Sequence, residues 1–413
     1  MMFNRKQKLI PLADRGPLRV MFTITSMPVG GAETLLVNLL RRMDRERFLP
    51  EVCCLKQPGP LGEQLADEIP VHSRLIANKF DFFVLRRLMQ LIQQRNIDAV
   101  VTVGAGDKMF WGRLAAWRTG VPVVISALHS TGWPDGISRM NRMLTPVTDA
   151  FVGVAKPHGI HLVENERFPE EKVYVIPNGV DMDRFRLCEE SRRRLREENG
   201  IPANAPVCGI VAALRPEKNH LLFLRAAAML KGEMSNAHFV IVGDGEERPT
   251  LERAANDAGL ADHVHFLGNR SDIPEVLSML DLFSLTSHNE ANPVSILEAM
   301  SIGLPVVSTD VGSVSETVRH DVTGFLAKPG AANEIARYWR EILTDRQEAS
   351  QMGVAARQVV VDHWSLERMV DGYQDLITET YEGKCQCSPS SPKPDRQVSE
   401  IPAHTQSTNS TSF

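Results

Sequence analysis

Long hydrophobic runs are missing from this sequence. No stretch of about 18 consecutive apolar residues occurs, and the N-terminal segment is charged without an apolar run of signal-peptide length. The sequence therefore predicts a cytoplasmic protein. Cysteine is also scarce, because the 413 residues include six cysteines, and those that are close together are adjacent or one residue apart, which is not a metal-ligand spacing. We expect reduced thiols without a functional role.

The sequence also lacks the features of metal-dependent and nucleic-acid-binding proteins. We expect no Asp-x-Asp carboxylate pair for a divalent metal after a strand, and His263 and His265, two apart in a predicted strand, have no further ligands nearby in the sequence. We therefore expect no metal and no cofactor. No basic run is interleaved with aromatic residues, and the net charge is -5, so nucleic-acid binding is not expected.

The charge is distributed unevenly along the chain. Residues 1–150 carry 20 Lys+Arg against 13 Asp+Glu, whereas residues 151–413 carry 26 against 38. A basic first half suits peripheral contact with an anionic membrane surface, or attraction of an anionic acceptor. Scattered, solvated charge is an equally good interpretation of the same numbers.

Short apolar runs alternate with longer amphipathic stretches, which predicts an α/β protein with parallel sheets. The first such runs are VMFTIT (20–25), AVVTVG (99–104) and VPVVISA (121–127), and the same rhythm restarts after residue 205. Near-continuous apolar strands are buried on both faces by helices, as in doubly wound folds. Because single cores stop growing at roughly 250 residues, we predict two Rossmann-like domains.

The domain boundaries follow from composition. A highly charged predicted helix, RRRLREENG, separates the two series of alternating strands and helices, so we place the domain boundary near residue 190. In the last 30 residues Ser, Thr and Pro occupy 14 positions, a composition that cannot bury enough apolar surface to fold. The predicted division is a flexible N-terminus (1–17), a first domain (18–190), a second domain (191–363 with a following helix) and a disordered tail (384–413).

Two loops carry candidate phosphate-binding groups. Gly30 and Gly31 follow the first strand and precede an amphipathic helix, where backbone N–H groups can approach a phosphate. Ordinary turn chemistry explains these glycines equally well, because neither the dinucleotide fingerprint nor the P-loop pattern is present. In the second domain, Arg215 and Lys218 follow a buried strand, where cations can meet a departing diphosphate. A plain charged loop is the alternative.

The most specific segment is SHNEANPVSILEAMSIGLPVV, in which Glu290 and Glu298 stand eight positions apart around a predicted helix start. Pro293 suits the first helical position, and the following N–H groups of Val294 and Ser295 would be free for an anion. Two carboxylates beside an anion-binding helix end fit recognition of sugar hydroxyls, since carboxylates accept hydrogen bonds from them. A pair of solvated surface glutamates is the alternative.

Together these segments resemble the large retaining glycosyltransferase family that carries the Glu-x7-Glu motif on the two-domain GT-B fold, called family 4 or group 1. The resemblance covers residues 20–381. It is carried by GGAE (30–33), IPNGVD (176–181), LRPEKN (214–219), VGDG (242–245), the Glu290 to Glu298 segment and VGSVSE (311–316).

The resemblance implies a donor held mainly by the second domain. Glu298 would bind the ribose hydroxyls and Glu290 the sugar. The diphosphate would lie between Lys218 and the backbone around Pro293 and Val294, with Gly31 closing over it from the first domain. His129 matches the family histidine that faces the sugar across the cleft. The resemblance also implies that a C-terminal helix, residues 364–383, returns to the first domain.

Three positions depart from the family pattern. Ala213 stands where the family usually has an arginine, and Arg215, two positions later on a strand end, faces the same side and is a candidate substitute. Ala291 replaces the glycine that usually follows the first motif glutamate. Ala155 replaces the serine that often opens the helix after FVGV, a change that we expect to be minor.

The predicted function is transfer of a sugar from a nucleoside diphosphate sugar to a saccharide or lipid-linked saccharide, with retention of configuration. The stereochemistry follows from the resemblance alone. Three alternatives remain: a sugar-nucleotide epimerase of the same fold, an inactive sugar-nucleotide-binding protein, for which Ala213 and Ala291 argue, and a nicotinamide dehydrogenase, suggested by VGDGEE. The sequence names neither the sugar nor the acceptor.

Overall fold

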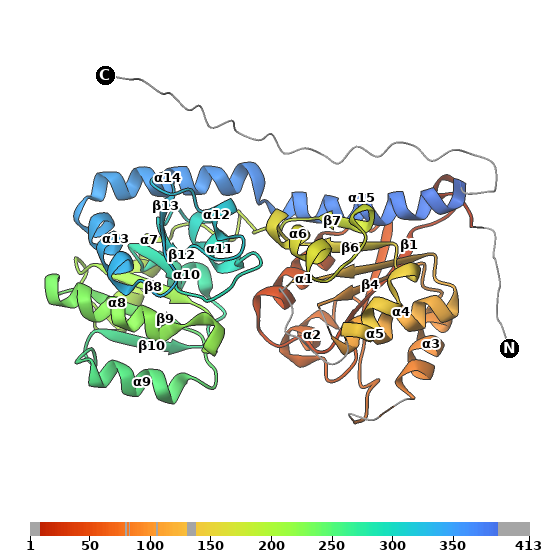
Figure 1. Cartoon of the computed structure of the whole chain (residues 1–413), viewed down its shortest axis with the longest axis horizontal. Coiled ribbons are helices and arrows are strands. Elements are labelled where there is room, and N and C mark those ends of the chain that lie inside the picture. The colour runs from red at the N-terminus through yellow and green to blue at the C-terminus, as the bar shows by residue number, and fades with distance from the viewer. Residues whose placement is uncertain (1–8, 79–80, 82, 105, 130–137, 387–413) are drawn as a thin grey trace, which may run out of the picture.

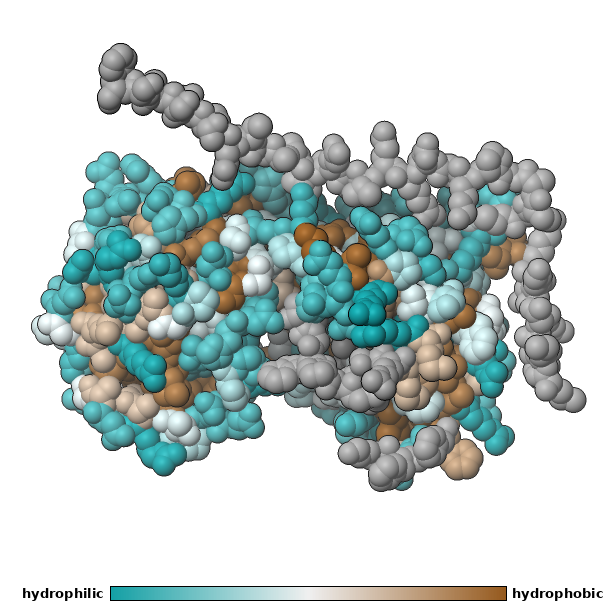
Figure 2. All heavy atoms as spheres, in the orientation of Figure 1, coloured by the Kyte–Doolittle hydropathy of each residue, from teal (hydrophilic) through white to brown (hydrophobic). Residues whose placement is uncertain are grey.

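The computed structural model describes residues 9–78, 81, 83–104, 106–129 and 138–386. Two lobes stand side by side, each with a parallel sheet between helices (Figure 1). The space-filling view shows a mostly hydrophilic face and a notch between the lobes (Figure 2). Within the described residues, no helix combines the length and apolar character needed to span a membrane.

The first lobe contains a sheet of strand order β3-β2-β1-β4-β5-β6-β7, with all pairs parallel. Its buried strands are rich in Val, Ile and Phe, residues that suit a sheet covered on both faces. The strands are β1 (Leu18–Ile24), β2 (Phe48–Cys54), β3 (Val71–His72), β4 (Ala99–Val103), β5 (Val123–Ala127), β6 (Ala150–Gly153) and β7 (Val173–Val175). The helices are α1 (Gly31–Arg42), α2 (Gly59–Leu65), α3 (Val84–Arg95), α4 (Asp107–Thr119), α5 (Ser138–Met143) and α6 (Lys156–Glu164).

The second lobe contains a sheet of order β10-β9-β8-β11-β12-β13, again parallel, over a single core cluster. Its strands are β8 (Val207–Val211), β9 (His238–Val242), β10 (Val264–Gly268), β11 (Leu282–Leu285), β12 (Val306–Thr309) and β13 (Gly324–Ala327). Its helices are α7 (Glu189–Glu198), α8 (His220–Glu233), α9 (Arg248–Asp257), α10 (Ile273–Ser278), α11 (Val294–Ser301), α12 (Val314–Thr317), α13 (Ala332–Thr344) and α14 (Arg346–His363). The two predicted α/β domains are therefore present.

The chain crosses between the lobes twice, and the two crossings touch. After β7 the chain passes into the second lobe, and α15 (Leu366–Gln386) returns along the first lobe (Figure 1). Val180 and Ser365 form a parallel bridge, in which Val180 donates to Trp364 O at 2.9 Å. A Cβ at Gly179 would lie 2.5 Å from Ser365 O, so the approach requires glycine.

The returning helix completes the first core. Leu366, Met369, Tyr373, Ile377 and Tyr381 are buried in the same cluster as residues of β1 and α1. The predicted return of the C-terminal helix is confirmed. Its extent differs, because α15 begins at residue 366 and continues to residue 386, beyond the predicted end at 383. The expected tail (384–413) thus begins inside the helix, and residues 387–413 lie outside the described residues.

The expectation of a flexible N-terminus (1–17) does not hold for residues 9–17. Arg15 donates to both carboxylate oxygens of Asp98, at 2.6 and 3.0 Å, and to the Tyr381 hydroxyl at 2.6 Å. The Tyr381 hydroxyl in turn donates to Ile10 O at 3.0 Å. A bidentate arginine and carboxylate pair next to a buried tyrosine fixes this segment, a long-range contact that local composition does not show. Residues 1–8 lie outside the described residues.

Candidate active site

The second lobe brings two charged side chains together where its strands end. Lys218 closes the short helical turn after β8, and Glu290 lies in the loop between β11 and α11. Lys218 Nζ is 2.6 Å from Glu290 Oε1, and the Ser287 hydroxyl donates to the same oxygen at 2.6 Å. The Glu290 side chain is only 8% exposed. The ion pair is thus fixed in a partly dry site, where charge interacts more strongly than in bulk water.

Hydrogen bonds to backbone carbonyl groups hold these two loops against each other. His288 N donates to Glu217 O at 2.8 Å, and the Thr286 hydroxyl donates to Asn219 O at 3.1 Å. Asn219 adopts the left-handed conformation, with φ of 49°, which ends the turn and starts α8. The turn that carries Lys218, after β8, is therefore fixed against the loop that follows β11.

A third loop, after β12, holds Glu290 from the other side. Ser313 N donates to Glu290 O at 3.2 Å, and the Ser313 hydroxyl bonds to Ala291 O. Gly312 has φ of 57°, and a Cβ there would lie 1.8 Å from Glu290 O. The glycine of VGSVSE thus allows the backbone to press against the Glu290 loop.

The start of α11 faces the first lobe. Pro293 is the N-cap residue, one position before the first helical position predicted for it, and the helix begins at Val294. The first N–H groups of a helix, here those of Val294 and Ser295, have no partner within the helix and favour an anion. Gly31 lies opposite, since a Cβ on it would be 3.7 Å from Val294 Cγ2.

Gly30 and Gly31 also form a helix start. Gly30 is the N-cap residue of α1, and Gly31 is its first residue. The N-termini of α1 and α11 therefore meet across the boundary between the lobes, and helix N-termini are the kind of group that holds phosphates. The structure brings Gly31 close to Val294, and these are two of the residues that the resemblance places around the diphosphate.

Glu298 lies one turn into α11, partly buried. Burial raises the pKa of its carboxyl to about 7, and the positive charge of Arg184 acts in the opposite direction. Arg184 itself follows the crossing segment and donates to Ser271 O at 3.1 Å. Burial removes water molecules that would otherwise donate hydrogen bonds to this carboxylate. Hydroxyl groups of a sugar can donate hydrogen bonds in their place.

A pocket with about 440 Å³ of empty space lies between the lobes. Glu290, Ala291 and Ser313 line it from the second lobe, while His158 and His161 line it from α6 of the first. Sequence reasoning did not identify either histidine. Their spacing of three along a helix places them on one face, but nothing in the sequence indicates that this face meets Glu290.

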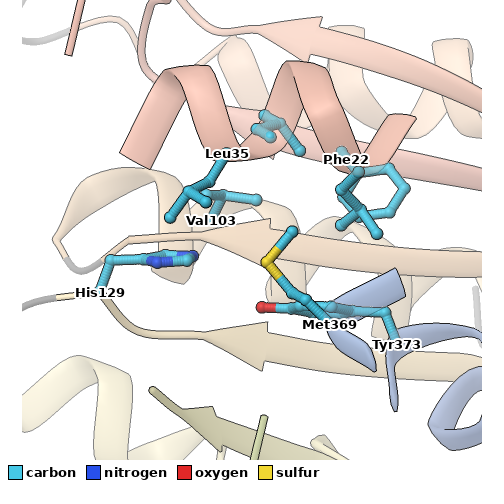
Figure 3. A pocket seen from close by; sticks show the side chains of 8 residues that line it. Phe22, Leu35, Val103, His129, Met369 and Tyr373 are labelled. Atoms are coloured by element: carbon cyan, nitrogen blue, oxygen red, sulfur yellow. The ribbon is translucent and has the colours of Figure 1, made fainter. Parts of the chain in front are cut away.

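His129, by contrast, lies at a different pocket. It follows β5 and lines a small hollow in the first lobe, together with Phe22, Val103, Met369 and Tyr373. Figure 3 shows its imidazole pointing into this hollow, beside Met369 and Tyr373 of α15. This pocket shares no lining residue with the pocket at Glu290.

The prediction that Arg215 replaces the arginine missing at Ala213 rests on wrong local geometry. β8 ends at Val211, so positions 213 and 215 are not on an extended strand. The chain turns at the buried Leu214, where Arg215 N donates to Ala213 O at 2.8 Å. The Arg215 side chain is 65% exposed, and its Nη1 lies 3.9 Å from Glu217 Oε1.

The glycines of VGDG have a structural role. A Cβ at Gly243 would lie 2.0 Å from Ala212 O, and a Cβ at Gly245 would lie 2.4 Å from Leu214 O. Both glycines therefore allow the loop after β9 to pack on the loop after β8. Close packing between two loops explains them without a bound dinucleotide.

No group of three or more His, Cys, Asp or Glu side chains in the described part of the chain is arranged to hold a metal ion. One Asp-x-Asp pattern does follow a strand, but Asp181 pairs with Arg42 at 2.6 Å and Asp183 pairs with Arg186. His265 also has a histidine neighbour that its sequence position did not reveal, His238, whose Nδ1 is 3.0 Å from His265 Nε2.

Family models match both lobes in order. Residues 29–184 match the model described as Glycosyltransferase Family 4, and residues 191–359 match the one described as Glycosyl transferases group 1. The chain belongs to this glycosyltransferase family. The first range contains β2 to β7 and the second contains β8 to β13, so the Lys218 and Glu290 pair lies in the group 1 part.

Curated relatives of this glycosyltransferase resemble it along most of their length. It is 28% identical over 372 residues to the UDP-Gal:alpha-D-GlcNAc-diphosphoundecaprenol alpha-1,3-galactosyltransferase of Escherichia coli, covering 86% of this chain and 95% of that one. It is 25% identical over 319 residues to the N-acetyl-alpha-D-glucosaminyl L-malate synthase of Bacillus anthracis, covering 74% and 82%.

Solved structures share the GT-B fold of this glycosyltransferase. HepE of Anabaena, crystallised with UDP and glucose, superposes with a TM-score of 0.78 at 23% identity, covering 87% of this chain and 99% of that one. WaaG, a glycosyltransferase involved in lipopolysaccharide biosynthesis, superposes with a TM-score of 0.68 at 17% identity and the same coverage. The predicted fold class is confirmed.

Proposed function

We propose that this glycosyltransferase moves a sugar from a nucleoside diphosphate sugar to a hydroxyl of a lipid-linked saccharide, with retention of anomeric configuration and without a metal. The observation that carries the proposal is the Lys218 and Glu290 pair, 2.6 Å apart, beside the helix start that faces Gly31. It combines a cation, a carboxylate and unpaired N–H groups in one place, which are the groups that a sugar diphosphate needs.

The donor would replace the ion pair with its own contacts. Lys218 turns to the diphosphate, which also receives N–H groups from the starts of α11 and α1, and Glu290 accepts hydrogen bonds from sugar hydroxyls. Glu298, one turn along α11, accepts hydrogen bonds from the ribose. As the bond between the anomeric carbon and the phosphate oxygen breaks, these donors stabilise the growing negative charge without a divalent cation.

The acceptor hydroxyl attacks from the face that the diphosphate leaves. Its oxygen bonds to the anomeric carbon, and its proton passes to the departing phosphate oxygen, so no protein nucleophile is required. Glu290 orients the sugar in this scheme, whereas His129, which the resemblance places beside the sugar, lines a separate hollow of the first lobe in this structure. The pocket between Glu290 and the α6 histidines gives the acceptor a route from the first lobe.

A lipid-linked acceptor is supported by the E. coli relative, whose name specifies a diphosphoundecaprenol-linked sugar, and by the basic first 150 residues, which suit an anionic membrane surface. The site of action would then be the inner face of the membrane. UDP is a reasonable nucleotide to test first, because the E. coli relative is named for UDP-Gal and HepE was crystallised with UDP.

A panel of nucleoside diphosphate sugars tests the proposal. Each donor is incubated with the protein and a polyprenyl diphosphate saccharide, and the release of nucleoside diphosphate is followed together with the product. We expect one donor to yield a glycosylated lipid with the anomeric configuration of the donor. Epimerised sugar without a glycosylated product would identify an epimerase, and donor binding without turnover would identify an inactive binder. Either result would overturn the proposal.

A further inference from the structure

Helix α6 of the first lobe has no cap of its own. Its N-cap residue is Ala155, whose side chain has no hydrogen-bonding atom, and its second residue is Pro157, which has no N–H group. The N–H of Lys156, the first helical residue, donates instead to Glu316 Oε2 at 3.1 Å. Glu316 belongs to α12 in the second lobe, 160 positions away. A carboxylate from one domain thus occupies the helix end of the other, where negative charge is favoured.

The capped helix carries the first-lobe wall of the pocket at Glu290. His158 and His161 lie within the first two turns after Lys156 and line that pocket. On the other side, Glu316 follows Ser313, whose N–H donates to Glu290 O at 3.2 Å. The short segment from 313 to 316 therefore contacts both walls of the pocket.

We propose that Glu316 is a positioning residue for sugar transfer: it caps α6 across the domain boundary and so holds the histidine-bearing face of α6 against the Glu290 loop when the domains close. The inference rests on the proposed function for its catalytic consequence, but the contact between the domains stands on geometry alone.

Because Ala155 cannot cap α6, the capping of this helix depends on Glu316 of the second lobe. A serine at position 155 would cap α6 from within its own domain, whatever the position of the other domain. A cap supplied by Glu316 exists only while the two lobes are close together, so the hydrogen bond of the first N–H group of α6 depends on the position of the second lobe. Burial raises the pKa of Glu316, while the N–H and ammonium group of Lys156 act in the opposite direction.

The first test needs no substrate. Small-angle scattering of the ligand-free, full-length protein is compared for the native chain, Glu316→Lys and Glu316→Gln. Glu246→Lys is the control, because Glu246 is an exposed residue of the same domain. A lysine at 316 places positive charge at a positive helix end, so we expect a larger radius of gyration, whereas the glutamine keeps an acceptor oxygen and stays close to the native value. An unchanged radius in Glu316→Lys would overturn the proposal.

The second test separates positioning from folding. With the donor that the panel identifies, Glu316→Ala is expected to keep donor affinity within about twofold, because Lys218 and Glu298 are untouched, and to lose about fivefold in kcat, the range of one lost helix cap. Adding Ala155→Ser restores a cap within α6 but not the contact between domains. We expect kcat to stay low in the double variant, and its full recovery would show a merely structural cap.

The two proposals fail separately. If no donor is turned over by the native chain, the proposed function fails, while the scattering comparison still decides whether Glu316 holds the lobes together. If transfer occurs but Glu316→Lys leaves both the radius of gyration and kcat unchanged, the function stands and the role of Glu316 is wrong.

Discussion

Lys218 and Glu290 are 72 positions apart in the sequence, yet Lys218 Nζ lies 2.6 Å from Glu290 Oε1. The cation proposed for the phosphate and the carboxylate proposed for the sugar therefore neutralise each other in the structure. Each group already has a partner of opposite charge, so neither is left as an isolated buried charge. A donor would exchange one ion pair for two sets of charge-assisted hydrogen bonds.

Replacing Lys218 by alanine is expected to weaken donor binding by about 1.5–3 kcal/mol, the usual value of a charge-assisted hydrogen bond. The variant also leaves Glu290, 8% exposed, without its cation, so the free energy of unfolding should fall. Calorimetry with the identified donor and denaturant unfolding measure the two effects. Lys328→Ala is the control, since that side chain is 85% exposed. Native donor affinity in Lys218→Ala would show that the phosphates bind elsewhere.

The titration of Glu298 should make the free energy of unfolding depend on pH. Its pKa of about 7 in the folded protein lies above the value of about 4.3 for an unfolded chain, so the folded state binds more protons between these pH values. Stability contributed by this group is therefore lost as the pH rises from about 4 to 7. Glu298→Gln should be more stable than the native protein by on the order of 1–3 kcal/mol at pH 8, with no gain at pH 4.

Denaturant unfolding of the donor-free protein at several pH values measures this difference. Glu246→Gln, at an exposed position, is the matched control and should show no pH-dependent gain. An equal gain for Glu298→Gln at pH 4 and pH 8 would contradict the explanation by titration. The same substitution should weaken donor binding, because an amide accepts fewer hydrogen bonds from ribose hydroxyls than a carboxylate.

Turnover is expected to survive removal of divalent cations. The proposed site stabilises the leaving diphosphate with Lys218 and helix-start N–H groups, and this electrostatic arrangement uses no metal. The measurement is transfer rate after dialysis against excess EDTA, compared with the same sample supplied with Mg²⁺ or Mn²⁺. Loss of activity that added metal restores would refute the prediction.

Two glycine substitutions should have opposite effects on stability. Gly179→Ala places a Cβ 2.5 Å from Ser365 O, where the two crossings meet, so backbone must shift and we expect a loss of more than about 2 kcal/mol. Gly232 lies in α8, and a Cβ there meets nothing within 4 Å, so Gly232→Ala should gain up to about 1 kcal/mol. Denaturant unfolding measures both. A neutral Gly179→Ala would show that the crossings can separate without cost.

The fold was predictable because the sequence patterns that indicate it lie within short, continuous segments. Runs such as AVVTVG and VPVVISA are apolar throughout, and each is followed or preceded by an amphipathic stretch, a pattern that parallel sheets covered on both faces produce. The segment from Glu290 to Glu298 was predictable for the same reason, since a helix start and two carboxylates lie within nine residues.

The contacts that complete the site are long-range, and the sequence does not show them. Glu316 and Lys156 are 160 positions apart, and Arg15 and Tyr381 are 366 apart. The absence of a capping serine at Ala155 was visible, but not the carboxylate that compensates for it. The expectation that positions 213 and 215 lie on one strand and face the same side fails because β8 ends at Val211, and element boundaries depend on packing as much as on local propensity.

The position of α15 in the first core has a consequence for biosynthesis. Strand β7 ends at Val175, but the first lobe still lacks Met369, Tyr373 and Tyr381, which come from the last helix. A ribosome adding about 5–20 residues per second needs roughly 10–40 s to make the intervening stretch. The second lobe, whose core is continuous in sequence from Val180 to Trp364, is complete before the first. The last part of the first core is therefore synthesised after the whole of the second core, and until then the apolar face that α15 covers has no partner from its own helix.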